Sequence, residues 1–194
     1  MFKPAHADLV AKIGKIFYLD SIVLNFAFEM EELEKDLYTR LSQSKGWGYL
    51  GGEERNLIAL FAQQDSAHFD VLNAARDALG YKDAGSTETL NTFASRRSRF
   101  FKYPALNDRE SVLNTALDVK ESVLFGYHGA VGIVRSKELL ATAAAIAGVE
   151  GRHAAALRQS IGLRPVPAPF EGAYAAQQTG YKLAKYGFQG GTPR

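Results

Sequence analysis

Ile146-Ala147-Gly148-Val149-Glu150-Gly151-Arg152-His153-Ala154 places one carboxylate and one imidazole three residues apart in an otherwise apolar run. Residues three apart share one face of a helix, so Glu150 and His153 project the same way. In apolar surroundings a buried charge needs a partner or a metal ion. Bundle proteins that hold two metal ions use such Glu-x-x-His units. Because the spacing also arises by chance on solvated helices, the segment predicts a site only if other helices supply further ligands.

Length and composition limit the possible classes of protein. The chain has 194 residues, enough for one domain with a full core, and 46% of them are hydrophobic. The net charge of +2 is too small to imply a nucleic-acid or membrane-surface partner. Cysteine is absent, which excludes disulfides and thiolate metal sites. The start at Met1 lacks the regions of a secretory signal, and no apolar run is long enough to span a membrane, so we expect a cytoplasmic protein.

The pattern of apolar residues and helix breakers predicts four helices. They span about residues 21–41, 53–80, 108–129 and 136–162, and a further helical segment at 7–19 precedes them. Asp20 or Ser21 is expected to cap the first helix, and Ser136 the fourth, because short polar side chains accept hydrogen bonds from free N–H groups there.

Loop lengths predict how the helices connect. The links between helices one and two and between three and four are short, so each pair should form an antiparallel hairpin. The link over 81–107 is long enough to run the length of the bundle. An all-α antiparallel four-helix bundle with one long crossover between helices two and three is the ferritin-like arrangement. We therefore predict a bundle with an N-terminal extension over 1–162, and a Pro/Gly-containing tail over 163–194 that packs on the bundle or on a partner subunit.

The inward face of each predicted helix follows steps of three and four residues. These stripes are apolar at both ends and ionisable in the middle. They comprise Leu24, Ala27, Glu31, Glu34, Tyr38 and Leu41; Phe61, Asp65, His68, Leu72, Ala75 and Leu79; Leu113, Leu117, Lys120, Leu124, Tyr127, Val131 and Val134; and Leu139, Ala143, Ile146, Glu150, His153 and Leu157. Four such coincidences are hard to attribute to solvated faces. By contrast, Glu29, Glu32 and Asp36 step along the other side of the first helix and indicate surface charge.

Four segments carry a family resemblance: Asp20–Ala27 with Glu31, Glu34 and Tyr38; Asp65–His68; Tyr127–Ala130; and Ala145–Ala154. With these segments the chain resembles the ferritin-like proteins related to plant desiccation-related proteins, a large bacterial group of mostly unassigned role. The similarity spans roughly residues 20–162, and its last segment is the most specific. Many relatives carry secretion signals, whereas this chain does not show one.

The resemblance implies a di-metal site at the centre of the bundle. In the wider superfamily, helices one and three each give a Glu, and helices two and four each give a Glu-x-x-His. By position, the implied metal ligands are Glu31, Asp65, His68, Glu150 and His153. Asp65 stands where the pattern has Glu, and its side chain is one methylene shorter.

The main departure from the pattern is Lys120, which stands where helix three should supply its Glu. Glu121 is adjacent but lies about 100° round the helix, so it would point inward only across a local π-bulge. An ammonium removes one ligand and adds a positive charge, which disfavours a standard di-iron centre.

Lys120 leaves two pictures open. In one, iron or manganese is bound as one ion or two, and the protein performs oxidase or metal-handling chemistry; oxygen and imidazole ligands suit zinc as well. In the other, the bundle is metal-free and non-catalytic, with a stress-related role, and Lys120 forms a buried ion-pair network with Glu31, Asp65 and Glu150. A catalytic lysine beside a metal is a less favoured third interpretation.

The remaining candidates have both a functional and a structural interpretation. Tyr38 and Tyr127 can donate hydrogen bonds to site carboxylates or be ordinary core tyrosines. Glu34 can be an extra ligand or a partner for Lys120. The basic and aromatic residues over 96–103 are more typical of packed aromatics under solvated arginines than of an RNA or DNA site, so we expect no nucleic-acid partner. His6 and His128 fall outside the stripes, and a homodimer is compatible with the extra terminal segments.

Overall fold

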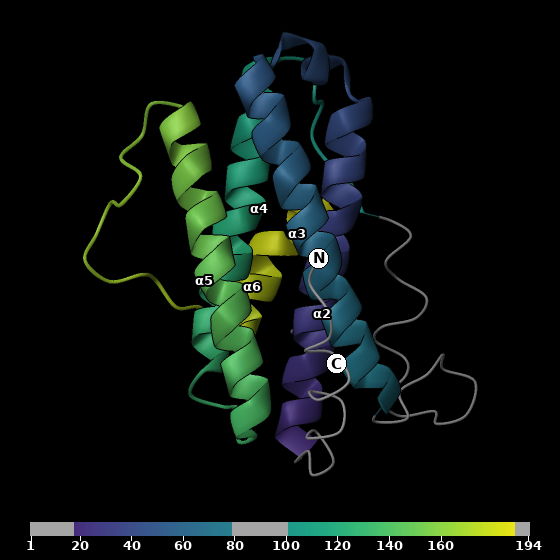
Figure 1. Ribbon diagram of the computed structural model, residues 1–194, viewed down its shortest axis with the longest axis vertical. Coiled ribbons are helices and arrows are strands. Elements are labelled where there is room, and N and C mark those ends of the chain that lie inside the picture. The colour runs from purple at the N-terminus through teal and green to yellow at the C-terminus, as the bar shows by residue number, and fades with distance from the viewer. Residues whose placement is uncertain (1–17, 79–100, 189–194) are drawn as a thin grey trace.

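The computed structural model describes residues 18–78 and 101–188, and every regular element in these ranges is helical. Four long helices form the bundle: α2 (Tyr18–Gln43), α3 (Gly52–Ala78), α4 (Arg109–Ala130) and α5 (Lys137–Ser160). A shorter helix, α6 (Ala176–Leu183), and two 3₁₀ turns, η1 (Lys45–Tyr49) and η3 (Ala184–Tyr186), complete the described part. Figure 1 shows α2 antiparallel to α3, α4 antiparallel to α5, and α3 running in the same direction as α4. The predicted all-α, ferritin-like bundle with one crossover is confirmed.

Polar caps at the helix starts explain this arrangement locally. Ser136 accepts a hydrogen bond from the backbone N–H of Leu139, as predicted, and Asp108 caps α4 through Ser111. The predicted cap at Asp20 or Ser21 is wrong, because α2 already begins at Tyr18. The Asp20 carboxylate instead accepts hydrogen bonds from the backbone N–H groups of Arg135 (2.6 Å) and Ser136 (2.8 Å). It therefore satisfies free donors at the start of a different helix.

The predicted inward stripes form the core. Their members are buried throughout the described ranges, apart from the partly buried His68 and the 49% exposed Val131, which follows the end of α4 at Ala130. Leu79 lies outside the described residues. The other side of α2 is also covered: Met30, Leu33 and Leu37 are buried. For this reason Glu29, Glu32 and Asp36 are only partly exposed, and Asp36 pairs with the exposed Arg40 at 3.5 Å.

The crossover and the tail supply this cover on the outer side of α2. Tyr103, at the end of the crossover, donates a hydrogen bond to the carbonyl of Leu33 at 3.0 Å. Phe188, at the end of the described tail, packs edge-on against Phe26 of α2. The backbone N–H of Lys102 donates to the Tyr186 carbonyl at 2.9 Å, which joins the two covering segments. The bundle is therefore closed on the side of α2 and α4.

Two glycines of α4 let the tail approach closely. A Cβ at Gly129 would lie 1.8 Å from the carbonyl oxygen of Tyr174, and one at Gly126 would lie 3.0 Å from Met30 Sδ and from Thr179 Cγ2. The N–H of Tyr174 donates to the carbonyl of Phe125 at 2.8 Å. The tail thus packs on its own bundle through α6. A contact with a partner subunit stays a prediction.

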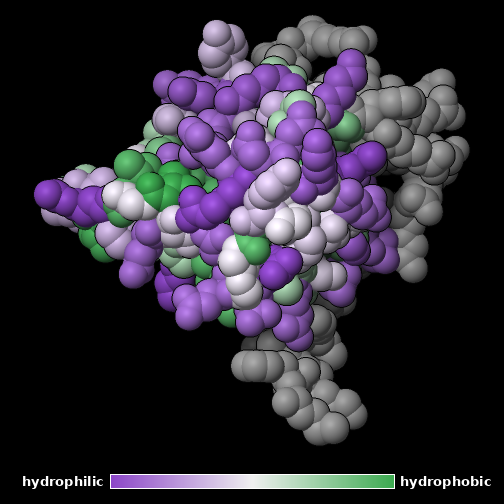
Figure 2. Space-filling model, turned by 90° about the horizontal axis from the view of Figure 1, so that it is seen from above, coloured by the Kyte–Doolittle hydropathy of each residue, from purple (hydrophilic) through white to green (hydrophobic). Residues whose placement is uncertain are grey.

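The outer surface is mainly hydrophilic. Figure 2 shows apolar side chains gathered toward one edge, on the side of α5 and the segment that follows it. Leu163, Val166 and Phe170 of that segment are exposed. None of the helices in the described ranges is long and apolar enough to cross a membrane.

Candidate metal centre

The ionisable middles of the four stripes meet at one level of the bundle. The side chains are Glu31 and Glu34 from α2, Asp65 and His68 from α3, Lys120 and Tyr127 from α4, and Glu150 and His153 from α5. The four carboxylates and Lys120 are completely buried, and only the His68 side chain, at 13%, keeps more than a trace of exposure. A charged cluster in an apolar core must be balanced internally or by a bound ion.

Lys120 lies among three carboxylates. Its Nζ is 2.5 Å from Asp65 Oδ2, 2.5 Å from Glu150 Oε2 and 2.8 Å from Glu34 Oε1. Burial alone would lower the pKa of Lys120, but the charges of these carboxylates hold it well above its usual value. The side chain is therefore an ammonium. Glu34 takes the place that the sequence-based network gave to Glu31.

His68 lies against the other oxygens of the cluster. Its Nδ1 is 3.2 Å from Glu150 Oε1, 3.6 Å from Glu31 Oε2 and 3.6 Å from Asp65 Oδ1. Burial would lower the pKa of His68, yet its interactions with Glu150 and Glu31 raise the pKa to about 10. Burial has the opposite effect on a carboxylate and would raise the pKa of Glu150. The charge of Lys120 and the interaction with His68 outweigh burial and bring the pKa of Glu150 to about 2.

Four ligand atoms around His68 lack hydrogen-bond partners. They are Glu31 Oε2, Asp65 Oδ1, Glu150 Oε1 and His68 Nδ1, and ligand atoms of these four residues lie within 4.8 Å of one another. The three oxygens lie within ion-pair distance of His68 Nδ1, but none of them is aligned for a hydrogen bond with it. Buried polar atoms are ordinarily hydrogen-bonded, so these four atoms need an explanation. The three carboxylate oxygens lie 3.2–3.6 Å from His68 Nδ1, so the four residues could hold one metal ion between them.

His153 lies beside this group of four rather than in it. Its Nδ1 is 3.5 Å from Asp65 Oδ1, and its ring packs on Phe61 with centroids 4.0 Å apart. Its Nε2 is 2.6 Å from Gln64 Oε1, and since an amide oxygen only accepts, Nε2 carries the proton. Burial and the charge of Lys120 lower the pKa of His153 to about 3, so the ring is neutral.

The fold agrees with a comparison to known families. The family model for a ferritin-like domain matches residues 19–163. The chain belongs to the ferritin-like domain family. No curated protein is similar enough to count as a match. The closer relationship to desiccation-related proteins stays a prediction.

Of the other candidate residues of this ferritin-like domain, Tyr127 and Tyr38 lie at the cluster and Glu121 lies away from it. Tyr127 donates a hydrogen bond to Glu31 Oε1 at 2.6 Å. The hydroxyl of Tyr38 has no hydrogen-bond partner in the described part, and its ring lies 5.5 Å from Lys120 Nζ. Glu121 pairs with Arg158 at 2.7 Å, and no π-helical turn interrupts α4, so Glu121 does not join the site.

The sequence did not indicate that Gln64 belongs to the site, where it contacts His153. It precedes Asp65 and lies off the inward stripe, where a polar residue is ordinarily a surface residue. The available signal was its position four residues before His68, which places both side chains on the same flank of α3.

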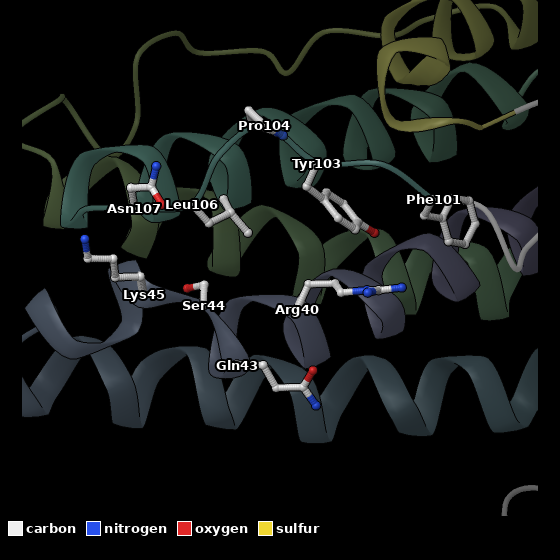
Figure 3. Close-up of a pocket in the computed structure, with 9 residues that line it drawn as sticks. All are labelled: Arg40, Gln43, Ser44, Lys45, Phe101, Tyr103, Pro104, Leu106 and Asn107. Carbon is white, nitrogen blue, oxygen red and sulfur yellow. The ribbon is translucent and has the colours of Figure 1, made fainter.

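A separate open pocket of about 410 Å³ lies where the crossover returns to the bundle. Figure 3 shows it between the end of α2, with Arg40 and Gln43, and the crossover segment with Tyr103 and Asn107. None of the cluster residues lines it. Most of the basic patch predicted over 96–103 lies outside the described residues, apart from residues 101–103.

Proposed function

We propose that this ferritin-like protein binds iron or manganese at Glu31, Asp65, His68 and Glu150 and uses the ion in oxidase or metal-handling chemistry. The observation that carries the proposal is the convergence of one ligand atom from each residue, all buried and without hydrogen-bond partners. Three carboxylate oxygens and one imidazole nitrogen are donors that iron, manganese and zinc all accept.

The buried carboxylates favour a nearby cation. Burial raises the pKa of Glu31, and it raises the pKa values of Glu34 and Asp65 well above their usual range, whereas Lys120 and His68 bring the pKa of Glu150 to about 2. Because uncompensated buried charge is costly, a metal ion beside these groups would favour their ionised forms.

Such an ion, when bound, supplies electron transfer to oxygen or peroxide. The chain's own residues prepare the position. Tyr127 binds Glu31 through Oε1, which leaves Oε2 directed toward His68. Lys120 holds one oxygen of Asp65 and one of Glu150, so each keeps a second oxygen free. The completely buried carboxylates are screened from bulk water.

The metal-free bundle is the second candidate, and one observation favours it. The raised pKa of His68 supplies an imidazolium close to Glu31, Asp65 and Glu150, which would place a cation where the metal is proposed. With Lys120 it would complete a buried ion-pair network and leave the protein with a non-catalytic, stress-related role.

Metal analysis of protein prepared without chelators distinguishes the two candidates. We expect near-stoichiometric iron or manganese in the wild type, loss of the metal in His68→Ala, and retention in the control His128→Ala, whose imidazole contacts the Gly172 carbonyl away from the cluster. A wild type without metal would support the ion-pair bundle. In that case Lys120→Met should destabilise the protein by about 3–5 kcal/mol, because buried carboxylates would lose their partner.

A further inference from the structure

Asp65 and Glu150 each face two different groups with their two oxygens. Asp65 Oδ2 and Glu150 Oε2 contact Lys120 Nζ, both at 2.5 Å. Asp65 Oδ1 and Glu150 Oε1 face His68 Nδ1, at 3.6 Å and 3.2 Å. The two carboxylates therefore lie between two neighbouring positions. One is filled by the ammonium, 2.5–2.8 Å from three carboxylates, and the other lies among oxygens of Glu31, Asp65 and Glu150 that are 3.2–3.6 Å from His68 Nδ1.

We infer that the Lys120 ammonium stands in the place of a second metal ion, so that the centre holds one metal ion and one ammonium. The inference rests on the proposed metal binding and goes beyond it, because it fixes the number of ions and assigns Lys120 as the reason. Bridging by Asp65 and Glu150 then joins a metal to a lysine rather than to another metal.

The surroundings of Nζ support this assignment. An ammonium has three N–H donors, and three carboxylates lie around it, the third being Glu34 at 2.8 Å. Glu34 does not belong to the group of four ligand residues, so its role is on the ammonium side of the centre. A metal ion at this position would have to displace a completely buried positive charge from three carboxylates.

Helix α4 offers no carboxylate to replace Lys120 as a ligand. Glu110 is exposed in its first turn, Glu121 pairs with Arg158, and Asp118 pairs with Tyr186 and Lys185. None of these three acids belongs to the cluster. The number of ions is therefore set by one residue, and changing that residue should change the number.

The test counts Mn²⁺ ions bound per chain at equilibrium and records their electron paramagnetic resonance spectrum. We expect one isolated ion in the wild type and two ions with a spin-coupled spectrum in Lys120→Glu, which exchanges the ammonium for a ligand. The control Lys185→Glu makes the same charge change at an exposed lysine and should bind one. Lys120→Ala frees three carboxylates without adding one, and it should also bind two Mn²⁺ ions. This variant replaces Lys120→Glu in the test if Lys120→Glu does not fold.

Each outcome bears on a different proposal. Two ions in the wild type, or one ion in a folded Lys120→Glu or Lys120→Ala, would overturn the inference and leave metal binding standing. No ion in the wild type would overturn metal binding and with it the inference. One ion in the wild type and in Lys185→Glu, with two in a Lys120 variant, supports both.

Discussion

At the residue scale, the cluster separates two kinds of carboxylate oxygen. Some oxygens are held by the chain itself, as Glu31 Oε1 is by Tyr127 and Asp65 Oδ2 is by Lys120. Others, such as Glu31 Oε2 and Asp65 Oδ1, have no hydrogen-bond partner. Orienting hydrogen bonds of the first kind are what give a metal ligand a fixed direction.

Tyr127→Phe tests this orienting role. The change removes the hydroxyl that donates to Glu31 Oε1 while keeping the ring, so we expect a loss of about 1–3 kcal/mol in the free energy of unfolding. We also expect Mn²⁺ affinity to fall about 10-fold or more. Urea denaturation and metal titration measure the two effects. Tyr181→Phe, at an exposed tyrosine, is the control. Unchanged affinity in Tyr127→Phe would show that Glu31 needs no such partner.

Gln64→Ala tests the contact that joins α3 to His153. Without the amide oxygen, the His153 imidazole loses the partner of its Nε2–H, and Nδ1 is no longer fixed toward Asp65. We expect about 10-fold weaker metal binding, measured by titration, with recovery in Gln64→Glu because a carboxylate also accepts this proton. The neighbouring, exposed Gln63→Ala should behave as wild type. Equal affinities for all three variants would argue against a role for His153.

At the element scale, the helices are held together by contacts that cross between them. Asp20 of α2 satisfies N–H groups at the start of α5, and Arg109 of α4 joins Glu54 of α3 to the Ser160 carbonyl at the end of α5. These contacts fix the axial positions of the helices, which is what brings the four ionisable stripes to one level.

Gly129→Ala tests the packing of the tail on α4. The new Cβ would overlap the Tyr174 carbonyl, so the tail has to move, and we expect destabilisation of about 1–3 kcal/mol. Limited proteolysis should cut faster within residues 163–175. Gly132→Ala is the matched control, because its Cβ meets nothing within 4 Å. Equal proteolysis of the two variants would mean that the tail does not depend on this close approach.

At the scale of the whole molecule, the tail and crossover cover α2 and α4 while the cluster keeps slight exposure at His68. The homodimer and the cytoplasmic location stay predictions. The segment after α5 exposes Leu163, Val166 and Phe170.

Metal binding should stabilise the whole bundle. An ion present at 100 times its dissociation constant contributes about 2.7 kcal/mol if it binds only the folded chain. For a chain of this size that corresponds to an increase in Tm of roughly 5–10 °C. Thermal unfolding with Mn²⁺, compared with chelator, measures the shift, and His68→Ala should show none. A wild-type Tm that ignores Mn²⁺ would contradict the proposed metal centre.

Four helices, the crossover between the second and the third, and the inward position of Glu31, Asp65, Lys120 and Glu150 could be predicted from the order of the residues. These features follow from helical periodicity and loop length, which are local properties of the chain. The pattern also indicated that Lys120 contacts Asp65 and Glu150, and it left the role of Glu34 open. Packing of the helices settled the remaining contacts: Glu34 rather than Glu31 contacts Lys120, Asp20 binds the start of α5, and His153 contacts Gln64. Such choices depend on the axial offsets of packed helices and on side-chain reach, within a few ångströms that periodicity does not specify.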